Sequence, residues 1–342
     1  MKKIVELICP HCNQILNERK SQLHCSICNR SFPIFDGIPS FIESDDGKIL
    51  KFYDEWHKKA ESFWNVRLWG KRKYFFPYKL KDYLKKNIVF RKIILNLCYF
   101  EGRKELFFRN AFKNDLEGLV LDLGCGKGND VYSIAGSVVG IDLSLYSLLE
   151  AKVKSIYQLL VHGDIIKLPF KNEQFDYIVS CDLIEHIPLP LKDTLYSEIY
   201  RVLKKGGKMV HFVTTDSKNI WFRFAHRYPD LFHKYLIEEI GGHHGLEMPT
   251  DLVQRIEKIG FIPLYKKKML WEPQEFVLRF NNEYKYKFIL VRLWVFICKI
   301  LIVNEVLGII INIPLGLFTR FIELIMPFDD SQHMGIIYKK QH

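Results

Sequence analysis

The sequence predicts an α/β fold built on a parallel, doubly wound sheet, and three observations support this prediction. An apolar run at residues 119–123 leads into a turn with glycines at every second position, followed by a helical pattern. A second apolar run, residues 138–142, closes on an aspartate twenty residues after Asp122. Two pairs of cysteines near the N-terminus mark a separate small unit. A strand, a glycine turn, a helix and a strand ending in an acid are typical of a nucleoside-binding site.

The first element along the chain, residues 1–43, carries two C-x-x-C knuckles. Cys9 and Cys12 form one knuckle, and Cys25 and Cys28 form the other after twelve intervening residues. Four thiolates at this spacing predict one tetrahedral Zn²⁺ site. We expect a structural ion, because a catalytic zinc keeps one position open. The unit is therefore predicted to be a zinc ribbon.

The second element, residues 44–114, is basic and rich in aromatic side chains. Between positions 48 and 113 it holds 18 Lys or Arg against 6 acids, and Asp115 brings the balance for residues 48–116 to +11. The whole chain also has a formal charge of +11, so the remainder is balanced. An excess of this kind predicts an acidic partner: a phosphorylated substrate, an anionic membrane surface or a nucleic acid.

The glycine turn, at residues 124–128, indicates which nucleoside is bound. The nicotinamide fingerprint spaces its glycines G-x-G-x-x-G, whereas this chain has glycines at 124, 126 and 128. Asp122 stands two residues before the first of them, where its charge would repel a pyrophosphate. A carboxylate there suits a cationic or amino-acid-bearing ligand instead. Asp142 is predicted to accept the ribose hydroxyls.

Four further motifs extend the pattern: HGDIIKLPF at 162–170, FDYIVSCDLIEHIP at 175–188, LKKGGKMV at 203–210 and MGIIYKK at 334–340. In this order, and with the glycine turn, the chain resembles the class I S-adenosylmethionine-dependent methyltransferases. The resemblance implies a Rossmann-like sheet of seven strands formed by residues 115–270 and 333–342. It also implies that residues 51–65 form a helix over the cofactor, with Tyr53 or Trp56 as its lid.

The same resemblance implies S-adenosyl-L-methionine as the cofactor and assigns residues to it. Asp122 would hold the methionine amino group, Asp142 the ribose, and Asp164 the adenine amine. For Asp164, a solvated turn acid is an equal alternative. The remaining predicted cofactor-binding positions are Gly124, Gly126, Leu143, Ile165 and Cys181.

Catalytic side chains are required only if the acceptor atom carries a proton that must be removed. Glu185 and His186 follow the fourth predicted strand, where such sheets bind their ligands. A Glu–His pair also recurs there in the resembled family without acting as a base. His243 and His244 form a second candidate pair, of which we expect one to face the substrate.

Residues 271–332 form an apolar insertion before the closing strand. Its two apolar runs are 288–303 and 306–328, and the longest uncharged stretch, 306–319, is shorter than the roughly eighteen residues expected of a spanning helix. One interpretation is a helix lying on the membrane surface. The other is a buried hairpin lining a substrate pocket or a dimer interface. Both favour a hydrophobic or lipid-attached acceptor.

Three hypotheses follow for the function. The first is a methyltransferase for a small hydrophobic or lipid-linked acceptor, such as a quinone precursor, a lipid or a lipid-carried glycan. The second is an RNA methyltransferase whose basic segment follows phosphates. The third is a non-catalytic partner protein that keeps the fold. The start of the sequence does not resemble a secretory signal, and the zinc interpretation leaves several cysteines unpaired, which suits a reducing compartment. We therefore expect a cytoplasmic protein, either free or peripheral at the inner face of the membrane.

Overall fold

The computed structural model describes residues 5–42, 100–112, 118–229, 242–270 and 305–341, together with positions 289, 290, 292, 293, 296 and 297. The predicted lid helix at 51–65, with Tyr53 and Trp56, lies outside the described residues. So do most of the basic segment and most of the first apolar run.

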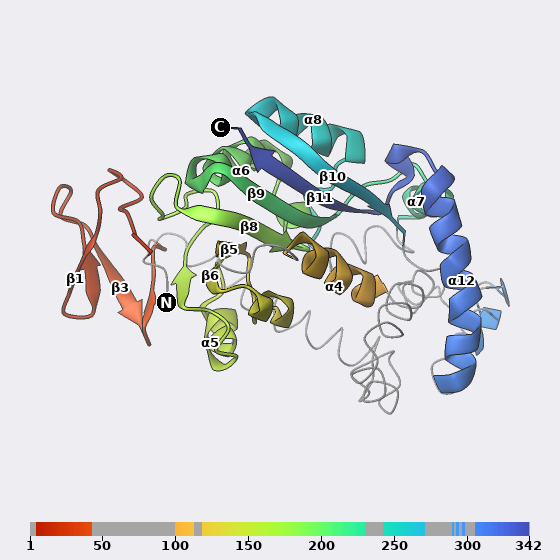
Figure 1. Ribbon diagram of the computed structural model, residues 1–342, viewed down its shortest axis with the longest axis horizontal. Coiled ribbons are helices and arrows are strands. Elements are labelled where there is room, and N and C mark those ends of the chain that lie inside the picture. The colour runs from red at the N-terminus through yellow and green to blue at the C-terminus, as the bar shows by residue number, and fades with distance from the viewer. Residues whose placement is uncertain are drawn as a thin grey trace.

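A seven-stranded sheet forms the centre of the described structure (Figure 1). Its strands, in spatial order, are β10 (Phe261–Met269), β11 (His333–Lys340), β9 (Leu203–Thr214), β8 (Phe175–Cys181), β5 (Leu119–Leu123), β6 (Ser137–Asp142) and β7 (Leu159–His162). The strands from β9 to β7 pair in parallel, whereas β11 is antiparallel to both of its neighbours. The predicted α/β class and largely parallel sheet are confirmed.

Helices cover both faces of this sheet, because the strand side chains alternate between two apolar cores. In β5, Leu119, Leu121 and Leu123 point into one core and Val120 into the other. The first core is closed by α6 (Leu189–Val202) and α8 (Pro249–Ile259). The second is closed by α4 (Phe100–Ala111) and α7 (Ile220–Arg227). The sheet is therefore doubly wound.

The prediction of an α-helix directly after the glycine turn is wrong. The structure has only η3, a short 3₁₀ helix at Asp130–Ile134, before β6 begins. Residues 124–136 connect β5 to β6, and only seven of them follow the capping residue Asn129. Asn129 caps the short helix by accepting a hydrogen bond from the Val131 N–H at 3.1 Å.

The N-terminal unit is a four-stranded antiparallel sheet that lies against the edge of the large sheet (Figure 1). Its strands are β1 (Asn17–Arg19), β2 (Gln22–His24), β3 (Ser31–Phe35) and β4 (Ile38–Pro39). Backbone bridges join Leu7 to Phe170 and Ser40 to His162. The unit thereby covers β7, the edge strand, whose backbone groups would otherwise be open to pairing with another chain.

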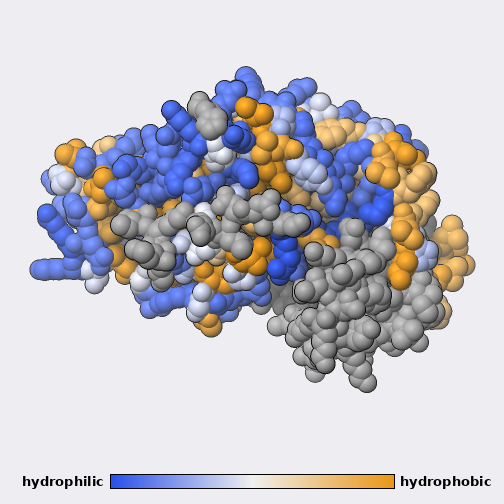
Figure 2. Space-filling model, viewed as in Figure 1, coloured by the Kyte–Doolittle hydropathy of each residue, from blue (hydrophilic) through white to orange (hydrophobic). Residues whose placement is uncertain are grey.

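In the last turns of helix α12 (Glu305–Ile325), Thr319 and Glu323 are buried while several large apolar side chains are exposed. Glu323 is buried, and its Oε1 accepts hydrogen bonds from Arg103 Nη2 and the Leu270 N–H, both at 2.7 Å. The outward row consists of Leu317, Phe318, Phe321, Leu324 and Ile325, all of them largely exposed. Figure 2 shows apolar side chains gathered over this helix. Among the described residues, no helix is long and apolar enough to cross a membrane.

We expect His211 on β9 to make the fold sensitive to mild acid. The ring is fully buried with Nδ1 2.6 Å from Ser180 Oγ, and burial lowers the pKa of His211 to about 3. An unfolded histidine has a pKa of roughly 6.5. Above that pH the ring is neutral in both the folded and the unfolded chain, so His211 does not reduce the free energy of unfolding. Below that pH the free energy of unfolding decreases, because the unfolded chain binds a proton at this histidine while the buried ring in the folded chain stays neutral.

The corresponding measurement is the free energy of urea unfolding between pH 5 and pH 8. His211→Gln should remove a slope of up to about 1.4 kcal/mol per pH unit below pH 6.5. Above pH 7.5 the two proteins should have equal slopes. An unchanged slope at pH 5–6.5 in the variant would show that His211 does not contribute.

Candidate functional site

The glycine turn and two buried aspartates lie together at the carboxyl end of the sheet. Asp122 pairs with Gly140 in the β5–β6 ladder, so Asp122 and Asp142 end neighbouring strands at the same edge. Gly124 and Gly126 have φ angles of 61° and 49°, in the left-handed region that glycine adopts most readily. At Gly124, a Cβ would also lie only 2.5 Å from Leu183 Cδ1. The backbone of the turn therefore depends on glycine at these positions.

Asp142 connects the two turns at this edge. Its Oδ2 accepts a hydrogen bond from the Gly126 N–H, and its Oδ1 accepts one from the Ser144 N–H, both at 2.8 Å. Each oxygen of an ionised carboxylate has a second lone pair available to a ligand. The side chain therefore fixes the glycine turn and remains chemically able to accept two ribose hydroxyls.

Asp122 is also buried, and its surroundings favour a cationic partner. Burial raises the pKa of Asp122 well above its usual value, the Tyr157 hydroxyl opposes this, and the charge of Asp142 adds to it. Tyr157 donates to Asp122 Oδ2 at 2.7 Å and accepts from the Asn129 N–H at 3.2 Å. An ammonium group bound here would stabilise the ionised carboxylate. Our sequence analysis missed Tyr157, since a single aromatic residue before a strand carries no spacing signal.

The predicted adenine side is linked to the N-terminal unit through one buried histidine. His162 Nε2 donates to the Leu143 carbonyl oxygen at 3.0 Å, which leaves Nδ1 to accept from the Ser40 hydroxyl at 2.9 Å. Asp164 Oδ1 accepts a hydrogen bond from the Ile166 N–H at 3.0 Å, so it serves its own turn as well. Ile165 is buried, and Cys181 is half-buried at the end of β8.

Of the four candidate catalytic residues, the structure brings three together. Glu185 is fully buried and its Oε1 accepts from the Thr214 N–H at 3.2 Å. Burial, with the nearby charge of Asp182, raises the pKa of Glu185 to about 8. The rings of His186 and His243 meet edge to face with centroids 4.8 Å apart. The side chain of His244 is exposed and is not part of this group.

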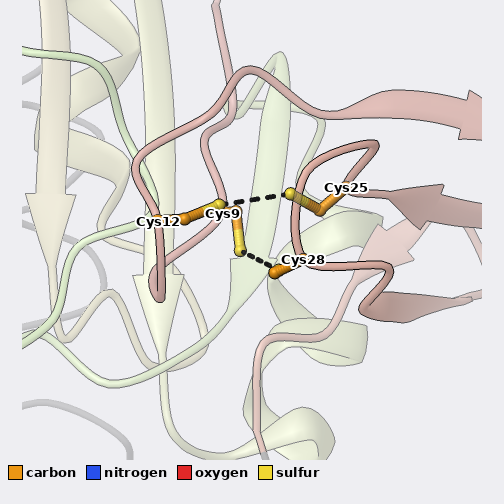
Figure 3. Close-up of side chains that lie close together, drawn as sticks. All are labelled: Cys9, Cys12, Cys25 and Cys28. Carbon is orange, nitrogen blue, oxygen red and sulfur yellow. Dashed lines mark hydrogen bonds between the residues drawn. The ribbon is translucent and has the colours of Figure 1, made fainter.

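The four N-terminal cysteines converge on one point between the two knuckles (Figure 3). The Sγ atoms of Cys9 and Cys28 are 3.5 Å apart, and those of Cys12 and Cys25 are 3.3 Å apart. Zn–S bonds of about 2.3 Å in a tetrahedron place sulfur atoms about 3.8 Å apart. All four thiols are free of disulfides. The residues present therefore fit a tetrahedral thiolate-bound ion.

Comparison with known proteins agrees with the geometry of the glycine turn. Residues 121–211 match the protein family described as a methyltransferase domain. A protein of Encephalitozoon cuniculi, itself named only provisionally as a methyltransferase, is 38% identical over 125 residues, 36% of this chain and 57% of that protein.

Two further relatives have named substrates. A demethylmenaquinone methyltransferase of Oceanobacillus iheyensis is 33% identical over 132 residues, 35% of this chain and 53% of that protein. A 24-methylenesterol C-methyltransferase of Arabidopsis thaliana is 31% identical over 169 residues, 45% of this chain and 44% of that protein. The chain thus spans about half the length of the curated relatives it matches.

We expect Asp142→Ala to weaken the binding of S-adenosylhomocysteine strongly. Two hydrogen bonds to a charged group are worth about 3 kcal/mol, which corresponds to a loss on the order of 100-fold in affinity. Calorimetric titration of the wild type and the variant measures this directly. Glu150→Ala, which removes an exposed acid from α5 (Leu145–Val153), is the matched control and should bind like the wild type. Equal affinity in Asp142→Ala would remove Asp142 from the site, provided that thermal unfolding shows the variant to be folded.

Proposed function

We propose that the chain is an S-adenosylmethionine-dependent methyltransferase. The observation that carries this proposal is the pair of buried aspartates flanking a left-handed glycine turn at the carboxyl edge of the sheet. This turn lies within the residues that match the methyltransferase domain. A protein that only used the fold as a scaffold would have no need of a second buried carboxylate, Asp122, beside the one that fixes the turn, which disfavours the non-catalytic hypothesis.

The side chains would contribute mainly by binding and orienting. Asp142 would take the ribose hydroxyls, and Asp122 would hold the methionine ammonium in a buried position where a charge pair is strong. The sulfonium of the bound cofactor supplies an already activated methyl group. Alignment of the two reactants can then contribute up to about 7–11 kcal/mol, so the protein needs little further chemistry for the transfer itself.

We propose a hydrophobic or lipid-linked methyl acceptor at a membrane surface. Two of the relatives are named for a demethylmenaquinone and a 24-methylenesterol substrate, both of which are lipophilic. The outward row on α12 consists of apolar side chains, while the polar residues of the same turns, Thr319, Arg320 and Glu323, are buried or only partly exposed. The chain also has a formal charge of +11, which is complementary to anionic lipid headgroups. A bilayer of anionic lipid would therefore bury the row and attract the protein.

This proposal predicts that methyl transfer depends on α12. Phe321→Glu combined with Leu324→Glu should lower flotation with anionic vesicles by at least tenfold, because charges on this row must stay in water. Transfer of labelled methyl groups to a lipid extract carried in those vesicles should fall in parallel. Val153→Glu is the matched control, since Val153 is an equally exposed apolar residue on α5.

The alternative outcomes of this experiment are distinct. Equal flotation of the α12 double variant and the Val153→Glu control would reject α12 as the membrane contact. Label appearing in RNA rather than in lipid, with binding that weakens steeply with salt, would favour the RNA methyltransferase hypothesis instead. Binding of S-adenosylhomocysteine without transfer to any extract would leave the acceptor class open and reject the lipid proposal.

We also propose that the four-cysteine site holds a structural Zn²⁺ ion. The sulfur separations support it, as does the small size of the unit, whose short strands provide little core of their own. The ion would keep the unit folded against β7.

Cys25→Ser should therefore lose one equivalent of zinc per chain relative to the wild type. Because metal binding of this kind supplies folding free energy of order 10 kcal/mol, amides in residues 5–42 and in β7 should exchange with solvent much faster. Metal analysis and hydrogen exchange by mass spectrometry are the measurements. Cys181→Ser, which alters a cysteine outside the cluster, should keep the metal. Unchanged zinc content in Cys25→Ser would contradict the proposal.

A further inference from the structure

Glu185, His186 and His243 converge from two separate segments of the chain. The first two belong to η4 (Ile184–His186), directly after β8, and the third belongs to the loop that precedes α8. One ligand atom from each side chain, a carboxylate oxygen or a ring nitrogen, lies within 4.8 Å of the other two. The neighbouring His244 takes no part.

The two segments are held firmly against each other. The Gly245 N–H donates to the Glu185 carbonyl oxygen at 2.8 Å, and Lys192 Nζ donates to the Gly245 carbonyl oxygen at 2.6 Å. A Cβ at Gly245 would lie 1.8 Å from the Ile187 carbonyl oxygen, so the loop passes as close to η4 as a glycine allows. The convergence of the three side chains is therefore built into the backbone.

One oxygen of the Glu185 carboxylate lacks a hydrogen-bond partner at the point where the three side chains meet. It is fully buried, and while Oε1 accepts from the Thr214 N–H, Oε2 has no hydrogen-bond partner. A buried polar atom without a partner costs about 1–3 kcal/mol. His186 donates from Nδ1 to the Gly242 carbonyl oxygen at 3.1 Å, which fixes the orientation of the ring. A backbone carbonyl that orients a histidine in this way is the usual outer partner of a metal ligand.

We propose that Glu185, His186 and His243 bind a divalent transition-metal ion such as Zn²⁺. Two imidazoles and one carboxylate suit ions of this class, and three protein ligands leave at least one coordination position open. In this respect the site differs from the four-cysteine cluster, whose thiolates would fill every position.

The position of this ion indicates a role in binding the methyl acceptor, and this step rests on the proposed methyltransferase function. The site follows β8 at the carboxyl edge of the sheet, the edge that also carries Asp122 and Asp142. An ion with an open position at this edge would bind an oxygen atom of the methyl acceptor and hold it in place. The acceptor would then belong to the class of lipophilic molecules that present an oxygen ligand, such as a hydroxyl or a phosphate.

The test is a titration of the full chain, first loaded with zinc in its cysteine site, with Co²⁺. Cobalt held by nitrogen and oxygen ligands gives visible d–d bands without the near-ultraviolet charge-transfer band of a thiolate ligand. The wild type should show these bands and saturate at one equivalent. His243→Ala and Glu185→Gln should bind Co²⁺ at least tenfold more weakly. His244→Ala, the adjacent control, should bind like the wild type.

The titration separates this inference from the proposed function. Asp142→Ala should lose S-adenosylhomocysteine and keep Co²⁺, whereas Glu185→Gln should lose Co²⁺ and keep S-adenosylhomocysteine. No saturable cobalt spectrum in the wild type would overturn the metal site, as would equal binding by His243→Ala. Cobalt binding in a chain that binds no S-adenosylhomocysteine would support the metal site and reject the methyltransferase proposal.

Discussion

The carboxylate of Asp142 is the interaction on which the arrangement of the site depends. By accepting from the Gly126 and Ser144 N–H groups, it joins the turn after β5 to the turn after β6. Ser144 then caps α5, since its hydroxyl oxygen accepts from the Ser147 N–H at 3.2 Å. One buried side chain thus fixes a glycine turn, a strand end and a helix start, which gives a nucleoside a rigid surface before it binds.

Patterns that are local in the sequence predicted the fold well. The apolar run of β5 and the spacing of the knuckle cysteines are local signals, and the closing strand at His333–Lys340 was expected from the resemblance of a short motif. The α-helix expected after the glycine turn is wrong, since the short connection between the two paired strands contains only the 3₁₀ helix η3.

Contacts between distant residues could not be predicted in this way. His243 meets His186 only because the backbone of Gly245 packs on η4. The orientation of α12 is set by the bond from Arg103 to Glu323, two residues 220 positions apart that carry no shared motif. A hydrophobic pattern alone predicts an apolar helix face turned toward the core, whereas this buried ion pair turns it toward solvent.

The place of β11 between β9 and β10 has a consequence for synthesis of the chain. Both neighbours are complete by Met269, yet the strand that pairs with them ends at Lys340. Until the ribosome has released that residue, β9 has an open edge and β10 has no partner in the sheet. Met334, Ile336 and Tyr338 are fully buried, so the apolar core is also incomplete until then. The nascent chain must therefore keep a half-built sheet from pairing with other chains throughout translation of the apolar insertion.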